Sequence, residues 1–279
     1  MAPHDNAPLV APRPAALAGD AAHGPPTNTG HAMMQDIELA DDAVRLPARV
    51  YRPDRPGPRP ALVLAPGGLQ QGNLPGHDWI GTRLAAAGYL ALGITYRAAN
   101  PLDDPLDVAL ALTWLEREPG ADRDRLAVFG GSRGGVTALR VAAGNPRVRA
   151  VIALAPPADL TRHTRSVAAF APARYAEQVA WMGGTPDEVP ARYAAVRALD
   201  YADRIHQPVL LIHGTLDMVA PWDHSIWMEQ ALRAAGNARV RLALIPLMGH
   251  FLEMTTQGYQ FDRVAGLIVD WLAPILNQP

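Results

Sequence analysis

From residue 61 onward, short apolar runs alternate with longer segments whose apolar residues recur every third or fourth position. The apolar runs are typical of buried strands, and the periodic segments are typical of helices. Such a repeated strand–helix order predicts an α/β fold with a mainly parallel sheet and helices on both faces. The predicted strands are 61–65, 89–96, 126–129, 150–155, 208–212 and 239–245, and the predicted helices are 79–87, 105–117, 133–143, 221–235 and 259–276.

Two extended segments, 36–39 and 44–52, come before this alternation. The acidic pair Asp41–Asp42 between them predicts a hairpin turn. Residues 1–34 are rich in Ala, Pro, Gly and His and show neither helical nor strand periodicity, which predicts a flexible tail. We therefore expect this tail to be followed by one catalytic domain over residues 35–279.

The alternation lapses between residues 156 and 207. This stretch contains two helical pieces bounded by prolines, and it separates two predicted strands. Long insertions without a regular pattern are commonly functional, for example as lids. The sequence therefore predicts a small helical cap at about 157–207, lying over the active site.

Composition narrows the possible chemistry. The chain has 25 basic and 27 acidic residues, a net charge of −2, and no cysteine. All of the basic residues are arginine, so neither a thiol nucleophile nor a lysine Schiff base is available. No His/Asp cluster has the spacing of a metal site, and no basic excess indicates a nucleic-acid partner. We expect no cofactor, no metal and a small-molecule substrate, and the sequence leaves open whether the chain forms a homo-oligomer.

Targeting signals are not evident in the sequence. Asp5 occupies the place of a basic leader segment, and prolines interrupt any apolar stretch near the N-terminus. No apolar run is long enough to cross a membrane. The expectation is a cytoplasmic protein without membrane association.

A candidate nucleophile follows the predicted strand 126–129. The sequence Gly130-Gly131-Ser132-Arg133-Gly134 fits the pattern G-x-S-x-G and leads directly into a predicted helix. In this context the serine occupies a tight turn, and the free amides of the helix N-terminus point toward a developing oxyanion. The alternatives are a glycine-rich strand–helix turn without catalytic function and a phosphate-binding loop, for which the pattern G-x-x-x-x-G-K-[ST] is absent.

A serine hydroxyl needs a base, and that base needs a carboxylate to orient it. Asp217 comes just after the predicted strand 208–212, and His250 comes after the strand 239–245. Ser132, Asp217 and His250 therefore stand at three strand ends in the order Ser, Asp, His. Each has a bland alternative as a turn, cap or loop residue, and His213 is expected to be structural.

The loop after strand 61–65 is expected to complete an oxyanion hole. Its sequence Pro66-Gly67-Gly68-Leu69 permits a close approach of the backbone. We assign the donors to the backbone N–H groups of Arg133 and of Gly68 or Leu69. A plain glycine turn is the alternative.

Substrate-binding candidates flank these motifs. Core packing is the alternative for each of the aromatic residues among them. Arg133 either enters the pocket to bind an acidic acyl or leaving group or forms an ion pair with a nearby carboxylate, and the ion pair is the expected arrangement. The candidates are Trp79, Trp181, Met218, Trp222 and Phe251.

These motifs resemble the prolyl oligopeptidase-like and dienelactone hydrolase-like branch of the α/β-hydrolase superfamily. The resemblance runs from about residue 61 to the end and includes Gly183-Gly184-Thr185-Pro186 and the segment around His213-Gly214-Thr215-Leu216-Asp217. It implies an α/β-hydrolase fold with a nucleophile elbow. Pro66 departs from the histidine usual in the oxyanion loop. Ser132 stands where dienelactone hydrolases have cysteine, and no segment long enough for a β-propeller precedes the domain.

The motifs and the resemblance together predict a serine hydrolase that cleaves carboxylic esters of small or medium size through an acyl-enzyme on Ser132. Three alternatives stay open. The first is an aminopeptidase or amidase, and the second is a biosynthetic thioesterase, acyltransferase or cyclase with the same triad. The third is a non-catalytic ligand-binding relative.

Overall fold

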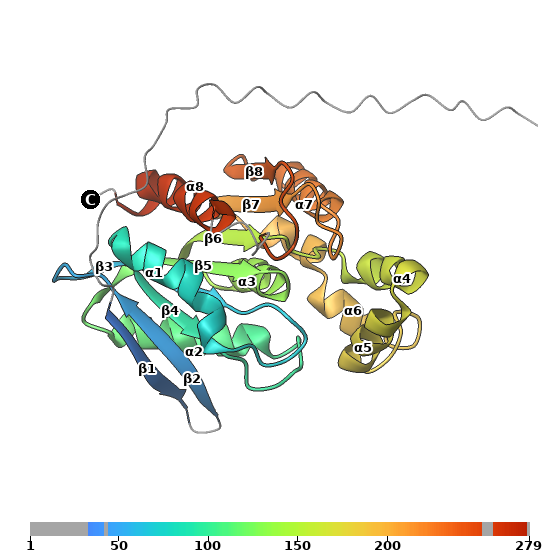
Figure 1. The fold of residues 1–279 in the computed structure, drawn as a ribbon, viewed down its shortest axis with the longest axis horizontal. Coiled ribbons are helices and arrows are strands. Elements are labelled where there is room, and N and C mark those ends of the chain that lie inside the picture. The colour runs from blue at the N-terminus through green and yellow to red at the C-terminus, as the bar shows by residue number, and fades with distance from the viewer. Residues whose placement is uncertain (1–32, 42–43, 253–258, 278–279) are drawn as a thin grey trace, which may run out of the picture.

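The computed structural model describes residues 33–41, 44–252 and 259–277 (Figure 1). Its strands form one eight-stranded sheet in the order β1-β2-β4-β3-β5-β6-β7-β8. β2 pairs antiparallel with β1 and with β4, and the other pairs are parallel. The predicted, mainly parallel sheet is therefore confirmed. The strands are β1 Met33–Ala40, β2 Arg45–Arg52, β3 Arg59–Ala65, β4 Leu90–Ile94, β5 Ala121–Gly131, β6 Val148–Leu154, β7 Val209–Gly214 and β8 Val240–Ile245.

The predicted N-terminal hairpin is the β1–β2 pair, whose register runs from Met33 opposite Arg52 to Ala40 opposite Arg45. At its turn, the Asp41 carboxylate accepts a hydrogen bond of 2.8 Å from the Val44 N–H. β1 begins two residues inside the predicted tail, because its pairing with β2 continues to Met33. The rest of that predicted tail, 1–32, lies outside the described residues.

Helices cover both faces of the sheet, as the alternating pattern predicts. α1 and α8 pack on one face through side chains such as Leu84 and Ile268, and α2, α3 and α7 pack on the other through side chains such as Leu112 and Leu139. The helices are α1 Asp78–Ala86, α2 Asp104–Arg117, α3 Arg133–Gly144, α4 Leu160–Phe170, α5 Pro172–Met182, α6 Pro190–Val196, α7 Asp223–Ala234 and α8 Tyr259–Leu276, with short 3-10 helices at Leu74–His77 and Ala198–Arg204.

The segment between β6 and β7 is the predicted cap segment, 157–207. It contains α4, α5, α6 and the second 3-10 helix. The sequence predicts only two helical pieces, bounded by prolines, in this segment. Figure 1 shows these three α-helices grouped beside one end of the sheet. A small cluster of apolar side chains, Leu160, Met182, Tyr193 and Val196, packs among them.

Across the described part of the chain, no helix combines the length and the apolar character needed to cross a membrane.

Candidate active site

Ser132 is the single residue between the end of β5 and the start of α3. Its backbone has φ 53° and ψ −119°, a conformation that a residue with a side chain rarely adopts. The Ser132 N–H donates to the Leu154 carbonyl of the neighbouring strand β6 at 2.7 Å. Strained residues of this kind persist only where the surrounding structure holds them, and they cluster at functional sites.

Glycines on both sides of Ser132 allow this turn to be tight. A Cβ atom on Gly130 would lie 2.1 Å from the Gly134 carbonyl carbon, and one on Gly134 would lie 2.2 Å from the Ala65 carbonyl oxygen. Any side chain at either position would therefore force β5, α3 and the end of β3 apart. The motif therefore needs glycine at both positions, because these three elements approach each other closely.

The loop after β3 borders the same turn. A Cβ atom on Gly67 would lie 3.4 Å from the Ser132 Cβ, and Gly68 has a positive φ of 85°. Arg133 is the first residue of α3, so its N–H has no acceptor within the helix. Gly68, Leu69 and Arg133 line one cavity with Ser132. Their role as oxyanion donors stays a prediction.

Asp217 lies just beyond β7, with its side chain buried. One carboxylate oxygen, Oδ1, accepts the N–H groups of Val219 at 2.9 Å and Ala220 at 2.8 Å, and the other, Oδ2, is 2.7 Å from His250 Nδ1. Burial alone would raise the pKa of Asp217, but hydrogen bonds from His213, His250 and Ala220 outweigh burial and hold this pKa below its usual range. Asp217 is therefore an ionised partner for His250.

The buried side chain of His213 contacts Asp217. Its ring is fully buried, with Nε2 2.8 Å from the Ala220 carbonyl oxygen and 3.3 Å from Asp217 Oδ2. Because Nε2 faces two acceptors, it must carry the hydrogen, and in the neutral ring the Ser225 hydroxyl then donates to Nδ1 at 2.7 Å. This residue, expected only to be structural, thus also contacts the candidate catalytic carboxylate.

Backbone contacts join the loop that carries Asp217 to the loop that carries His250. The Leu216 N–H donates to the Met248 carbonyl and the Leu247 N–H donates to the Thr215 hydroxyl, both at 3.0 Å. A Cβ atom on Gly214 would lie 1.9 Å from the Met248 carbonyl oxygen, so glycine is required where the loops meet. These contacts bring the predicted acid and base together.

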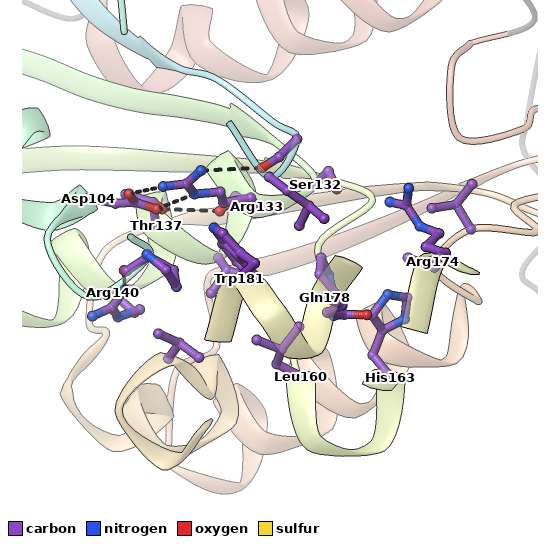
Figure 2. Close-up of a pocket in the computed structure, with 18 residues that line it drawn as sticks. Asp104, Ser132, Arg133, Thr137, Arg140, Leu160, His163, Arg174, Gln178 and Trp181 are labelled. Atoms are coloured by element: carbon purple, nitrogen blue, oxygen red, sulfur yellow. Dashed lines mark hydrogen bonds and ion pairs between the residues drawn. The ribbon is translucent and has the colours of Figure 1, made fainter. Parts of the chain in front are cut away.

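A cavity of about 610 Å³, including the space at its mouth, opens beside Ser132 (Figure 2). Arg133 forms one wall and makes the expected ion pair, with its Nη2 2.5 Å and its Nε 2.7 Å from the two carboxylate oxygens of Asp104. The guanidinium also stacks over Tyr96 at 4.4 Å and Trp181 at 5.1 Å. Other lining residues come from α3, α4 and α5, namely Val136, Thr137, Arg140, Leu160, His163, Arg174 and Gln178.

Of the five predicted substrate-binding side chains, Trp181 alone is among those that line this cavity. Trp79 instead packs between Phe129 and Phe261, with ring centroids 6.0 and 5.1 Å away, because α1 covers the opposite face of the sheet. The other three are not among the lining residues: Met218 and Phe251 are 78% and 64% exposed, and Trp222 directly precedes α7.

Sequence reasoning missed His163, Arg174 and Gln178 as cavity residues. Arg174, Gln178 and Trp181 stand at positions i, i+4 and i+7 of α5, so they share one helix face. This helix face with side chains that can form hydrogen bonds can be recognised in the sequence. It indicates a cavity only when the position of α5 relative to Ser132 is known. Among the described residues, no group of three or more His, Cys, Asp or Glu side chains could hold a metal ion.

Two buried histidines, His163 and His224, lie edge to face with ring centroids 5.8 Å apart. Burial, reinforced by Arg174, lowers the pKa of His163 to about 4. Burial, reinforced by His163, lowers the pKa of His224 to about 3. At a pH between these folded-state pKa values and the ordinary histidine pKa of about 6.5, the two histidines bind protons in the unfolded chain but not in the folded protein. Folding stability therefore falls as the pH is lowered through this window.

We therefore expect His224→Asn to flatten the dependence of unfolding free energy on pH between 6.5 and 4.5. Asparagine can still accept the hydrogen bond that the Asp159 N–H donates to His224 Nδ1, but it does not titrate. The expected change in slope is up to about 1.4 kcal/mol per pH unit. Denaturant unfolding at several pH values measures it, with His206→Asn at an exposed position as the control. Identical slopes in His224→Asn and wild type would contradict the prediction.

Comparison with protein families gives one match over most of the chain. The model of the prolyl oligopeptidase family, Peptidase_S9, matches residues 72–278. This range contains Ser132, Asp217 and His250.

Relatives of this chain include both peptidases and esterases. An uncharacterized peptidase of Bacillus subtilis, YtmA, is 25% identical over 229 residues, which span 75% of this chain and 82% of that protein. The esterase LipC of Mycobacterium tuberculosis is 30% identical over 243 residues, which span 78% of this chain and 59% of LipC.

A solved structure described as a Mycobacterium tuberculosis puromycin-hydrolyzing peptidase matches the fold with a TM-score of 0.73 at 20% identity. The match covers 89% of this chain but only 40% of that peptidase, so this chain spans well under half of its length. The sheet and this match together confirm the predicted α/β-hydrolase fold.

Proposed function

The chain belongs to the prolyl oligopeptidase family of serine hydrolases, and from that premise we propose that it hydrolyses carboxylic esters of small or medium size through an acyl-enzyme on Ser132. The active residues in this proposal are Ser132, His250 and Asp217. The chain is a hydrolase by family membership, and the choice of esters rests on the cavity described above.

In the proposed mechanism, the Ser132 hydroxyl oxygen attacks the ester carbonyl carbon while His250 Nε2 takes the hydroxyl proton. Asp217, 2.7 Å from Nδ1, fixes the ring orientation and stabilises the imidazolium that forms. The N–H groups of Arg133 and of Gly68 or Leu69 bind the oxyanion. His250 then protonates the departing alcohol, and a water molecule, deprotonated by His250, hydrolyses the acyl-enzyme.

One observation favours an esterase over an aminopeptidase. Among the described residues that line the cavity, Asp104 supplies the only carboxylate. Both of its oxygens are bound by Arg133, and one also accepts from the Thr137 hydroxyl at 3.1 Å. An aminopeptidase needs a carboxylate free to bind the substrate ammonium group, and Asp104 is not free.

We expect kcat/KM for p-nitrophenyl butyrate to exceed that for alanine p-nitroanilide by at least about 100-fold, or ~2.7 kcal/mol in transition-state free energy. Both assays release a chromophore, and Ser132→Ala serves as the blank. Comparable rates on the two substrates would replace the esterase by a peptidase or amidase. No turnover of either substrate would reject simple ester hydrolysis and favour acyl transfer or ligand binding.

A further inference from the structure

The cavity beside Ser132 contains positive charge that no described residue neutralises. We propose that the substrate is an ester that carries a carboxylate group, and that Arg174 of α5 binds this carboxylate. The inference rests on the proposed ester hydrolysis and specifies its substrate class. Ester hydrolysis can be correct while this inference is wrong, so the test must separate the two.

Several buried polar atoms in the described part of the chain have no hydrogen-bond partner. Five of them belong to side chains that line this one cavity: Arg140 Nε, His163 Nδ1, Arg174 Nε, Gln178 Oε1 and Trp181 Nε1. His163 and Gln178 are only 4% and 3% exposed. Buried polar groups are nearly always paired in folded proteins, so a cluster of unpaired ones beside a nucleophile indicates a polar ligand.

Most of these unpaired atoms are hydrogen-bond donors. Arg140, Arg174 and Trp181 offer N–H groups, which can only donate. His163 Nδ1 donates or accepts according to the tautomer of the ring, and Gln178 Oε1 only accepts. The complement of such a set is a group that mainly accepts, and a carboxylate has two acceptor oxygens and a negative charge that strengthens each bond.

Positive side chains outnumber negative ones among the described residues that line the cavity. In the described part of the chain, the charged residues that line it are Arg133, Arg140, Arg174 and Asp104. The Arg133–Asp104 ion pair cancels, and His163 is neutral near pH 7 because burial and Arg174 lower its pKa to about 4. Two positive charges remain, on Arg140 and Arg174. The neighbouring Asp217 is already bound by His213 and His250.

Arg174 is the better candidate of the two. The Arg140 guanidinium already donates to the carbonyl oxygens of Pro101 at 2.6 Å and Leu102 at 3.5 Å. Arg174 makes no ion pair or hydrogen bond with any described residue, although its Nε is buried. In Figure 2, the Arg174 side chain is drawn to the right of Ser132 with its guanidinium at about the height of Ser132, and Gln178 and His163 are drawn below it. A substrate bound to Ser132 can therefore extend toward this group.

The experiment compares esters that differ only in charge. One arm places the carboxylate on the acyl side, with monomethyl adipate against its neutral amide, methyl adipamate. The other places it on the alcohol side, with 4-acetoxybutanoate against 4-acetoxybutanamide. We expect wild type to prefer the carboxylate in one arm by roughly 10-fold or more in kcat/KM. Acid release at constant pH measures all four rates.

Variants assign the preference to Arg174. Because each ratio is taken within one variant, a general loss of activity cancels. Arg174→Gln should bring the ratio close to one, mainly through a higher KM for the carboxylate ester, and Arg174→Lys should restore part of it. Arg165→Gln on the adjacent helix α4 is the matched control, because Arg165 is paired with Asp187 at the surface. It should keep the wild-type ratio.

A wild-type enzyme that cleaves p-nitrophenyl butyrate but shows no carboxylate preference in either arm would overturn this inference and leave the esterase intact. No turnover of any ester would instead reject the proposed function. A preference that survives in Arg174→Gln would move the binding role away from Arg174. If the variants do not fold, wild type still decides, because adipate should inhibit p-nitrophenyl butyrate cleavage at least about 10-fold more strongly than adipamide.

Discussion

Ser132→Ala is expected to lower kcat/KM for p-nitrophenyl butyrate on the order of 10⁶-fold, down to what oxyanion binding alone can supply. The reason is chemical: without the hydroxyl oxygen no acyl-enzyme forms, and His250 has no proton to accept from position 132. Steady-state rates of purified wild type and variant measure the loss, with wild-type active sites counted by a fluorophosphonate and the variant's concentration taken from its absorbance. A variant within about tenfold of wild type would reject Ser132 as the nucleophile.

Substitutions of Ser132 also separate the loss of catalytic activity from changes in folding stability. Alanine keeps the Cβ that makes φ 53° unfavourable, so Ser132→Ala should leave Tm within a few degrees of wild type. Ser132→Gly should be equally inactive but more stable than the alanine variant by about 1 kcal/mol, because glycine adopts this backbone without strain. Thermal unfolding of the three proteins tests this order. A less stable glycine variant would contradict the idea that the turn stores strain.

The fold was predictable because strand and helix periods are local properties of the sequence. Segments such as 61–65 and 133–143 became β3 and α3 with small changes at their ends. β5 extends beyond the predicted strand 126–129, back to Ala121, because Ala121, at the start of its polar first half, pairs with Arg59 of the neighbouring strand β3. Pairing of that kind depends on a neighbouring strand and leaves no apolar run to recognise.

The candidate site was predictable where the residues follow strand ends. Parallel strands bring their carboxyl ends to one edge of the sheet, so Asp217 and His250 could be expected to meet there. The cavity wall was not predictable, because it comes from helices of the cap segment whose placement depends on tertiary packing. Trp79 illustrates the difference: it adjoins a motif in the sequence, yet α1 carries it to the opposite face.

Arg133 connects stability with the proposed chemistry. Its guanidinium donates to Asp104 and also to the Gln70 carbonyl at 2.7 Å, within the loop that carries the predicted oxyanion donors Gly68 and Leu69. Arg133 and Asp104 are only 5% and 1% exposed. Burial raises the pKa of Asp104, and the hydrogen bonds from Arg133 and Thr137 oppose that rise. The pair therefore stabilises the protein only while both partners are present.

Asp104→Ala is accordingly expected to lower the unfolding free energy by about 3–5 kcal/mol, because it leaves a buried guanidinium without a counter-charge. The double variant Arg133→Met, Asp104→Leu should recover most of this loss, since well-packed apolar side chains need no counter-charge. Asp187→Ala, which breaks the exposed Arg165–Asp187 pair, is the control and should cost at most about 1 kcal/mol. Denaturant unfolding measures all three. Because the double variant also releases the oxyanion loop, it should regain stability without regaining wild-type kcat. Full recovery of kcat would show that Arg133 does not position that loop.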